Sequence, residues 1–234
     1  MMNEILTAGL AEWQLTADER QLAQLRDFFV RVVETNRVMN LTAITEPEEF
    51  AVKHYLDCAS LLTVQPFDGL SVVDVGCGAG FPGMPLKLLC PACEITLLDS
   101  LGKRIRFLQE CIDEMGLSGI QAVHARAEEF AKQHRESYDC AVSRAVARLN
   151  VLAELSLPMV KVGGRFLAMK SKDSDEEISE ANHAIQTLGG DIADIRDVTI
   201  PGTEITHRLV IIEKIKPTPA KYPRPFRKIK ERPL

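Results

Sequence analysis

The sequence predicts an α/β protein with a doubly wound, mostly parallel sheet and a helical extension at its N-terminus. Two patterns predict this fold class. From about residue 70 onward, short β-branched segments alternate with segments whose apolar residues recur at the three- and four-residue spacing of a helix. Directly after the first β-branched segment, glycines stand at positions 76, 78, 80 and 83. Such a cluster before a helix is typical of a loop that brings backbone close to a ligand.

The composition is that of a soluble globular protein of 234 residues, with 46% hydrophobic residues and a formal net charge of -5. We expect it in the cytoplasm, since the N-terminus lacks a signal-peptide pattern and no apolar stretch reaches the roughly 18 residues of a membrane span. The six cysteines are scattered, which favours reduced thiols. Cys90 and Cys93 have redox or metal spacing, but without a second pair we expect two structural thiols and no metal.

Residues 1–66 form the predicted helical extension. Thr16 and Glu19 make a capping box, which predicts a helix over about 17–36. Thr45 and Glu48 make a second box, which predicts a helix from there to about residue 62. The segment between them is polar and turn-like, and its Asn40 is either a turn residue or a residue that faces the substrate.

Residues 67–215 form the predicted α/β domain, with seven strands. We expect strands at 71–75, 94–98, 120–124, 139–142, 165–169, 192–199 and 208–213. Helical patterns lie between most of them, as parallel pairing requires. The last two strands have no helix between them and are joined by a loop at Pro201 and Gly202, so we expect them to be antiparallel neighbours.

The glycine loop indicates which ligand the sheet holds. A nicotinamide-binding turn would read G-x-G-x-x-G, but here Phe81 stands where the third glycine would be. Asp74 stands at the end of the preceding strand, and Asp99 closes the next strand, where an acid can hold ribose hydroxyls. The segment VDVGCGAG resembles the first motif of class I S-adenosylmethionine-dependent methyltransferases, in which the methionine part of the cofactor passes close over the loop. We expect Arg126, Ala127 and Glu128 near the adenine.

Most of the chain resembles the glucose-inhibited division protein B family. The segments VVDVGCGAGFPGMPLKL, LLDSLGKRIRFL, VSRAVARLN and THRLVIIEK carry this resemblance, which covers about residues 20–225. The family's fold is the Rossmann-like, seven-stranded class I methyltransferase fold, and its members methylate guanine N7 in 16S rRNA. The resemblance thus implies S-adenosyl-L-methionine as the cofactor. We expect the following residues to bind it: Asp74, Gly76, Gly78, Gly80, Phe81, Asp99, Ser100, Ala127, Glu128 and Arg144.

The chemistry implied by the resemblance needs no general base. Guanine N7 is an unprotonated lone pair at neutral pH and can attack a methyl group without losing a proton. Arg144, at the end of the fourth strand, and Asn40 are therefore expected to position the reacting groups. His54 and Asp57 share a helix face. They are either a base with its orienting group or a structural hydrogen-bonded pair.

Basic residues suggest how RNA is held. Near strand ends we expect Lys103, Arg126, Lys170 and Arg208 to meet phosphates. The tail, residues 216–234, has seven Lys or Arg, one Glu and five of the twelve prolines. We expect it to be extended and not helical. Its Lys221 and Arg224 suit contact with RNA, and the alternative is a solubilising tail.

Together with the resemblance, these observations favour a monomeric rRNA (guanine-N7)-methyltransferase that acts on 16S rRNA in an assembled or partly assembled small ribosomal subunit. The acidity of the chain before the tail argues against indiscriminate RNA binding. Three alternatives stay open. They are a methyltransferase for a small molecule or a protein, a nicotinamide oxidoreductase on the same fold, and an RNA-binding module without catalysis.

Overall fold

Seven strands form one sheet in the order β3-β2-β1-β4-β5-β7-β6 in the computed structural model, which describes residues 1–234. Strands β1 to β5 are mutually parallel, whereas β7 runs antiparallel to both β5 and β6. The doubly wound sheet and its antiparallel last pair are thus confirmed. The strands are β1 (Ser71–Val75), β2 (Glu94–Asp99), β3 (Ile120–His124), β4 (Tyr138–Arg144), β5 (Val160–Ser171), β6 (Gly190–Thr199) and β7 (Thr206–Lys214).

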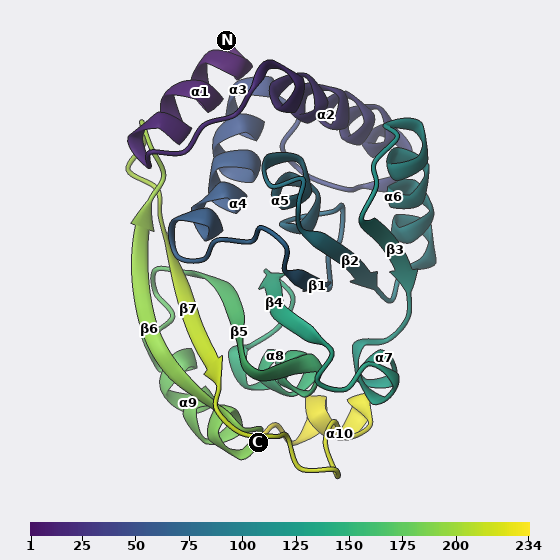
Figure 1. Ribbon diagram of the computed structural model, residues 1–234, viewed down its shortest axis with the longest axis vertical. Helices are drawn as coiled ribbons and strands as arrows, with labels where there is room; N and C mark the ends of the chain where they lie inside the picture. The colour runs from purple at the N-terminus through teal and green to yellow at the C-terminus, as the bar shows by residue number, and fades with distance from the viewer.

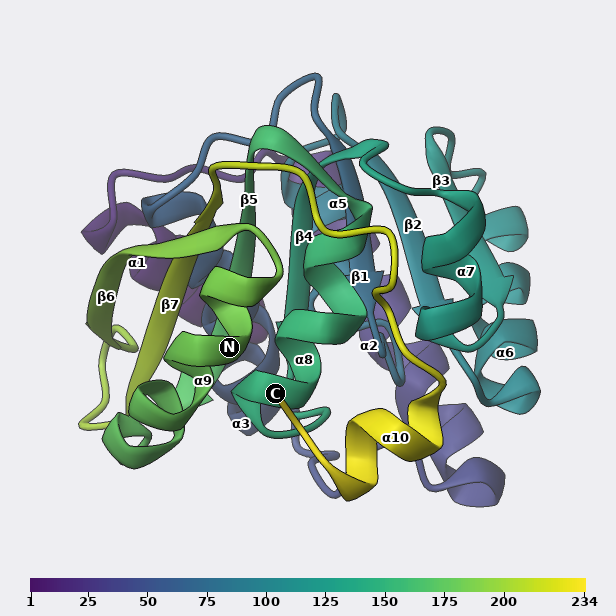
Figure 2. The same cartoon turned by 90° about the horizontal axis from the view of Figure 1, so that it is seen from below.

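Helices cover both faces of the sheet (Figure 1). One face carries α1 (Met2–Glu12), α2 (Glu19–Met39), α5 (Gly83–Leu89), α6 (Gly102–Glu114) and a helical segment made of α3 (Pro47–Phe50), η1 (Ala51–Leu56), α4 (Asp57–Ala59) and η2 (Ser60–Thr63). Figure 2 looks onto the other face, with α7 (Ala127–Gln133), α8 (Leu149–Ser156), η3 (Leu157–Met159), α9 (Asp175–Thr187) and α10 (Phe226–Glu231). No helix is both long and apolar enough to cross a membrane.

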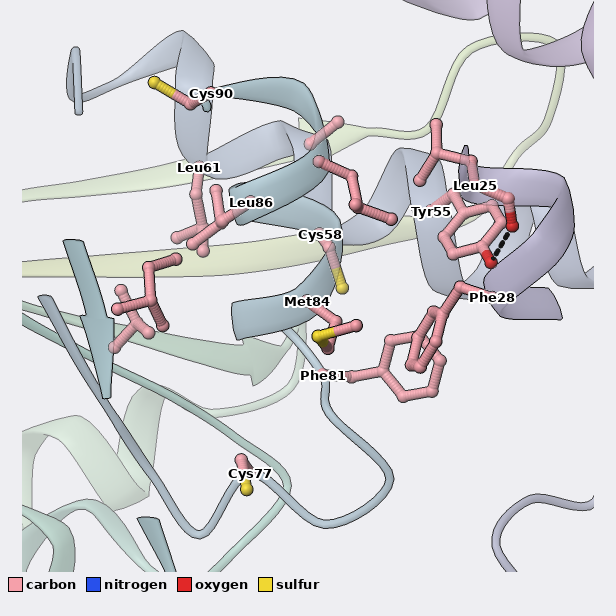
Figure 3. Close-up of a cluster of buried hydrophobic side chains, with 14 of the residues drawn as sticks. Leu25, Phe28, Tyr55, Cys58, Leu61, Cys77, Phe81, Met84, Leu86 and Cys90 are labelled. Atoms are coloured by element: carbon pink, nitrogen blue, oxygen red, sulfur yellow. Dashed lines mark hydrogen bonds between the residues drawn. The ribbon is translucent and has the colours of Figure 1, made fainter. Parts of the chain in front are cut away.

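Alternation along the strands sends side chains into two cores. In β1, Val72 packs with the N-terminal helices, whereas Val73 packs with α7 to α10 on the opposite face. The first core joins the extension to the sheet without a break. Figure 3 shows part of it, where the Tyr55 hydroxyl donates a hydrogen bond of 2.6 Å to the carbonyl of Leu25. The division into an extension (1–66), a domain (67–215) and a tail (216–234) remains a prediction.

The N-terminal helices begin at other residues than the capping boxes predicted. Asp18 caps α2, with Gln21 completing the box, so the pairing of Thr16 with Glu19 was wrong. Glu46 precedes α3 and makes no side-chain capping bond, so Thr45 is not a cap either. The proline at the first helical position fixes the start of α3 without one. Helix α1 had no predicted counterpart.

The expectation of a tail without helix was wrong at its end. Residues 226–231 form α10, preceded by Pro225. The prolines occupy positions up to 225 and then 233, so the intervening residues keep their backbone donors and can form a helical turn. Ile229 is fully buried in the second core and holds α10 against the domain.

Candidate active site

The carboxyl ends of strands β1 to β4 surround a cavity of about 550 Å³. It lies beside the point where the chain order of the strands reverses, between β1 and β4, which is where open α/β sheets bind ligands. The predicted cofactor-binding residues line it, with two exceptions, Asp74 and Gly80. Those that line it are Gly76, Gly78, Phe81, Asp99, Ser100, Ala127, Glu128 and Arg144.

The three glycines of the loop after β1 have different surroundings. All three have positive φ values, of +75°, +58° and +100° for Gly76, Gly78 and Gly80. A Cβ on Gly76 would lie 2.6 Å from Val146, and one on Gly80 would lie 2.8 Å from Leu108 and Met84. A Cβ on Gly78 would meet only the Arg104 guanidinium, at 3.8 Å. Gly78 is therefore the glycine whose missing side chain leaves the cavity open.

Asp99 joins the first two loops of the site. One carboxylate oxygen accepts the Gly78 N–H at 2.9 Å, and the other accepts the Leu101 N–H at 2.8 Å. Arg104 lies 3.9 Å from the same side chain. Each carboxylate oxygen has a further lone pair, so Asp99 can organise the loops and still accept a hydrogen bond from a ligand hydroxyl.

Asp74 lies beneath the glycine loop and not in the cavity. One of its carboxylate oxygens accepts the Gly83 N–H at 2.8 Å, at the start of α5, and the other is buried without a partner. Burial raises the pKa of Asp74 to about 7, against the opposing effect of that hydrogen bond. This geometry fits a residue that holds the loop to α5, and its role toward the cofactor stays a prediction.

The loop after β3 forms the next wall. Glu128 is buried and accepts a hydrogen bond of 2.6 Å from Nε of Arg126. On its other side the Arg126 guanidinium lies 4.6 Å from the ring centre of Phe226, which also lines the cavity. Phe226 is a lining residue that sequence reasoning missed, because nothing near it in the sequence indicates that the tail returns to this loop.

Arg144, at the end of β4, is held by the two residues that the sequence paired. Its guanidinium donates to Asp57 at 2.7 Å and to Nδ1 of His54 at 3.0 Å, and it lies 5.1 Å from the ring centre of Phe81. The His54 ring stacks on Phe81 with 4.5 Å between ring centres. A guanidinium can only donate, so Nδ1 of His54 carries no proton and Nε2 donates to the Thr42 hydroxyl at 2.9 Å.

The charges of this cluster are fixed by their surroundings. Burial and the nearby Arg144 charge lower the pKa of His54 to about 3, so its ring is neutral at physiological pH. Burial acts to raise the pKa of Asp57, but hydrogen bonds from His207 and Arg144 outweigh it and the pKa lies below its ordinary value. The hydrogen bond that His207 donates to Asp57 also raises the pKa of His207. His54 and Asp57 both bind Arg144, and neither is free to accept a substrate proton.

The remaining predicted residues do not converge on the cavity. Asn40 ends α2 with a φ of +50° and lines, with Lys103, a separate hollow of about 500 Å³ between α2 and α6. Arg126 is the one predicted RNA contact that lines the main cavity. The others are engaged elsewhere: Lys170 binds Glu177, Arg208 binds Asp175 and Asp197, Arg224 binds Glu154, and Lys221 lies over the Tyr222 ring.

The strand order, the glycine loop and the acids at the carboxyl ends of β1 and β2 define a class I S-adenosylmethionine-dependent methyltransferase. The model of the GidB family, described as rRNA small subunit methyltransferase G, matches residues 21–205. The chain belongs to this family.

Curated relatives match nearly the whole chain. Ribosomal RNA small subunit methyltransferase G of Alkaliphilus metalliredigens is 49% identical over 223 residues, which cover 94% of this chain and 93% of the relative. The protein of that name from Lactobacillus johnsonii is 42% identical over 239 residues, with 100% of both chains covered. Among solved structures, M. jannaschii TYW2 in complex with AdoMet superposes with a TM-score of 0.55 at 14% identity, over 68% of this chain and 75% of that one. This last likeness concerns the fold alone.

Proposed function

We propose that this protein transfers the methyl group of S-adenosylmethionine to N7 of one guanine in 16S rRNA. Membership of the family supports the RNA substrate. The observation that carries the choice of N7 is that no proton acceptor stands free at the Arg144 end of the cavity. His54 is neutral and already accepts from Arg144, and Asp57 is paired with Arg144 and His207. A nucleophile that must shed a proton would have no base here, whereas N7 needs none.

In this proposal the residues of the chain bind the cofactor and orient the reacting groups. S-adenosylmethionine, when bound, supplies a methyl group on a sulfonium. Gly78, Asp99 and Glu128 are the residues we assign to holding it, through backbone clearance and carboxylate oxygens that line the cavity. Phe81, stacked on His54, gives that end of the cavity a fixed apolar wall. Orientation of this kind contributes up to roughly 7–11 kcal/mol when the reacting atoms are held in line.

The charge balance near Arg144 suits a reaction that leaves positive charge on the guanine ring. The Arg144 side chain is 17% exposed, and Asp57 at 2.7 Å offsets its charge. Because burial and the Arg144 charge keep His54 unprotonated, the wall beside the substrate gains no second cation. We therefore assign Arg144 to positioning and not to proton transfer.

The substrate that we assign is 16S rRNA within an assembled or partly assembled small ribosomal subunit. We assign the protein to the cytoplasm, as a monomer. The net charge of -5 gives the protein no general attraction for polyanions. Ion pairs with neighbouring carboxylates engage Lys170, Arg208 and Arg224. Such a protein needs shape and an exposed base to bind RNA, and a folded particle presents both.

Mass mapping of rRNA tests the proposal. Cells with and without the gene should differ by one 7-methylguanosine in 16S rRNA, and a plasmid copy of the parent protein should restore it. In vitro, small subunits should be methylated faster than deproteinised 16S rRNA. A methyl group on guanine N1 or N2 would contradict the mechanism, and a preference for deproteinised RNA would contradict the assembled substrate.

A further inference from the structure

The C-terminal residues return to the cavity. Phe226, the first residue of α10, lines the cavity beside Ala127 and Leu155, and its ring lies 4.6 Å from the Arg126 guanidinium. In Figures 1 and 2 α10 lies beside α8, far along the chain from the loop after β3 that it meets. The ring is partly exposed, as expected of an apolar group with one face toward an open cavity.

Residues 216–225, here called the strap, are held to the domain by partly buried polar contacts. Arg224 makes a bidentate ion pair with Glu154 of α8, with N–O distances of 2.9 and 2.6 Å, and the Glu154 side chain is fully buried. Arg135 donates to the Tyr222 carbonyl at 2.7 Å. Charge-assisted, bidentate pairs of this kind fix position as well as adding stability.

Ile229 fixes the far side of the same turn. It is fully buried in the core formed with α7, α8 and α9, three residues after Phe226 on the helix. Phe226 is therefore fixed from both sides, by the strap before it and by Ile229 after it. The Phe226 ring therefore has a fixed position at the cavity.

We propose that Phe226 is a cofactor-binding residue, whose ring packs against the adenine of S-adenosylmethionine. This inference rests on the cofactor site described above. The wall that Phe226 shares is the loop after β3, where Arg126, Ala127 and Glu128 stand and where the adenine is expected. An aromatic ring offers adenine a stacking surface, and the Arg126 guanidinium on the ring holds its orientation.

Calorimetry with two probes tests the proposal. S-adenosylhomocysteine carries the adenosine and the amino acid, whereas methylthioadenosine carries the adenosine without the amino acid. Phe226→Ala should weaken both by about the same factor, roughly tenfold, because loss of one base–aromatic stack has this order of effect. Phe226→Trp should keep or increase both affinities. Arg227→Ala is the matched control, since Arg227 is 86% exposed on the same helix and pairs only with Glu231.

A fluorescence readout covers the case in which Phe226→Ala fails to fold. Trp13 is the only tryptophan, so Trp13→Phe combined with Phe226→Trp places a single reporter at the cavity. S-adenosylhomocysteine should quench that reporter, and it should leave unchanged a reporter made by Lys228→Trp, at an exposed position of α10.

The outcomes separate the two proposals. If the parent protein fails to bind S-adenosylhomocysteine, the cofactor site itself is wrong. If the parent binds but Phe226→Ala binds both probes equally well or more tightly, Phe226 is an idle or occluding residue and this inference is wrong. Loss of affinity for S-adenosylhomocysteine alone would place the ring at the amino-acid end and would also overturn it.

Discussion

Replacing Gly78 by valine should prevent cofactor binding while leaving the fold intact. Gly78 has a φ of +58°, which costs a side-chain-bearing residue roughly 1–2 kcal/mol. Gly116, in the turn after α6, provides a matched control. It has a φ of +62°, a Cβ there meets nothing within 4 Å, and it does not line the cavity. Gly78→Val and Gly116→Val should therefore carry similar strain, which lowers the melting temperature of each by about 2–8 °C.

The two variants should differ only in how much the ligand raises their melting temperature. At a concentration 100 times its Kd, S-adenosylhomocysteine stabilises the folded parent protein by about 2.7 kcal/mol, which raises the melting temperature by roughly 5–11 °C. Gly116→Val should show the same rise from its lower starting point. In Gly78→Val, a hundredfold loss of affinity would leave about 0.4 kcal/mol, or roughly 1–2 °C. Equal rises in the two variants would refute the assignment of this loop to the cofactor.

Four further outcomes are expected. Asp99→Ala should weaken S-adenosylhomocysteine binding by roughly 1.5–3 kcal/mol in calorimetry, and unchanged affinity would exclude a ligand hydrogen bond. His54→Ala should lower the single-turnover methylation rate by much less than the 10²–10⁴-fold loss that follows removal of a general base. The rate of the parent protein should be nearly flat from about pH 6 to 8.5. A sigmoidal pH–rate profile in the parent that is lost in His54→Ala would show that His54 is a base. Substituting Lys228 and Lys230 with glutamine should reduce the salt slope of RNA affinity by roughly 0.7–0.9 per phosphate contact, and an unaltered slope would make the tail a solubiliser. Because the pKa of Asp74 is raised from 3.8 to about 7, its contribution to stability is present below about pH 4 and is lost as the pH rises to about 7. In denaturant titrations over that pH window, Asp74→Asn should therefore lose less stability than the parent protein, and parallel curves for the two proteins would contradict this.

Local patterns in the sequence predicted the sheet and those cavity-lining residues that directly follow or close strands β1 to β4. Strands β1 and β3 have the bounds that their β-branched segments predicted, and the acid at 99 closes β2 as expected. These features depend on period-two alternation and on residues that follow a strand directly, which are local properties. Capping was less predictable, because Thr16 and Asp18 stand two residues apart and either residue type can cap a helix, and the structure has Asp18 as the cap.

Contacts between distant segments could not be predicted. His207 and Asp57 meet because β7 ends up beside the N-terminal helical segment, and no spacing in the sequence encodes that approach. The same holds for Phe226 at the loop after β3. From the sequence, Lys170 and Arg208 were expected to be free cations near strand ends. In the structure they form ion pairs with Glu177 and Asp197, which belong to other elements of the fold. The role of a charged residue thus depends on partners that only the fold supplies.

The position of β7 has a consequence for the nascent chain. Strand β5 is interior in the finished sheet, but its second neighbour, β7, is made only after residues 172–205 have been added. Until then β5 presents an unpaired backbone edge next to Phe166 and Leu167, which are fully buried in the native protein. An apolar edge of this kind can pair with other chains. Slow translation across residues 172–205 should therefore increase aggregation, and a chain truncated before Thr206 should be found in the insoluble fraction.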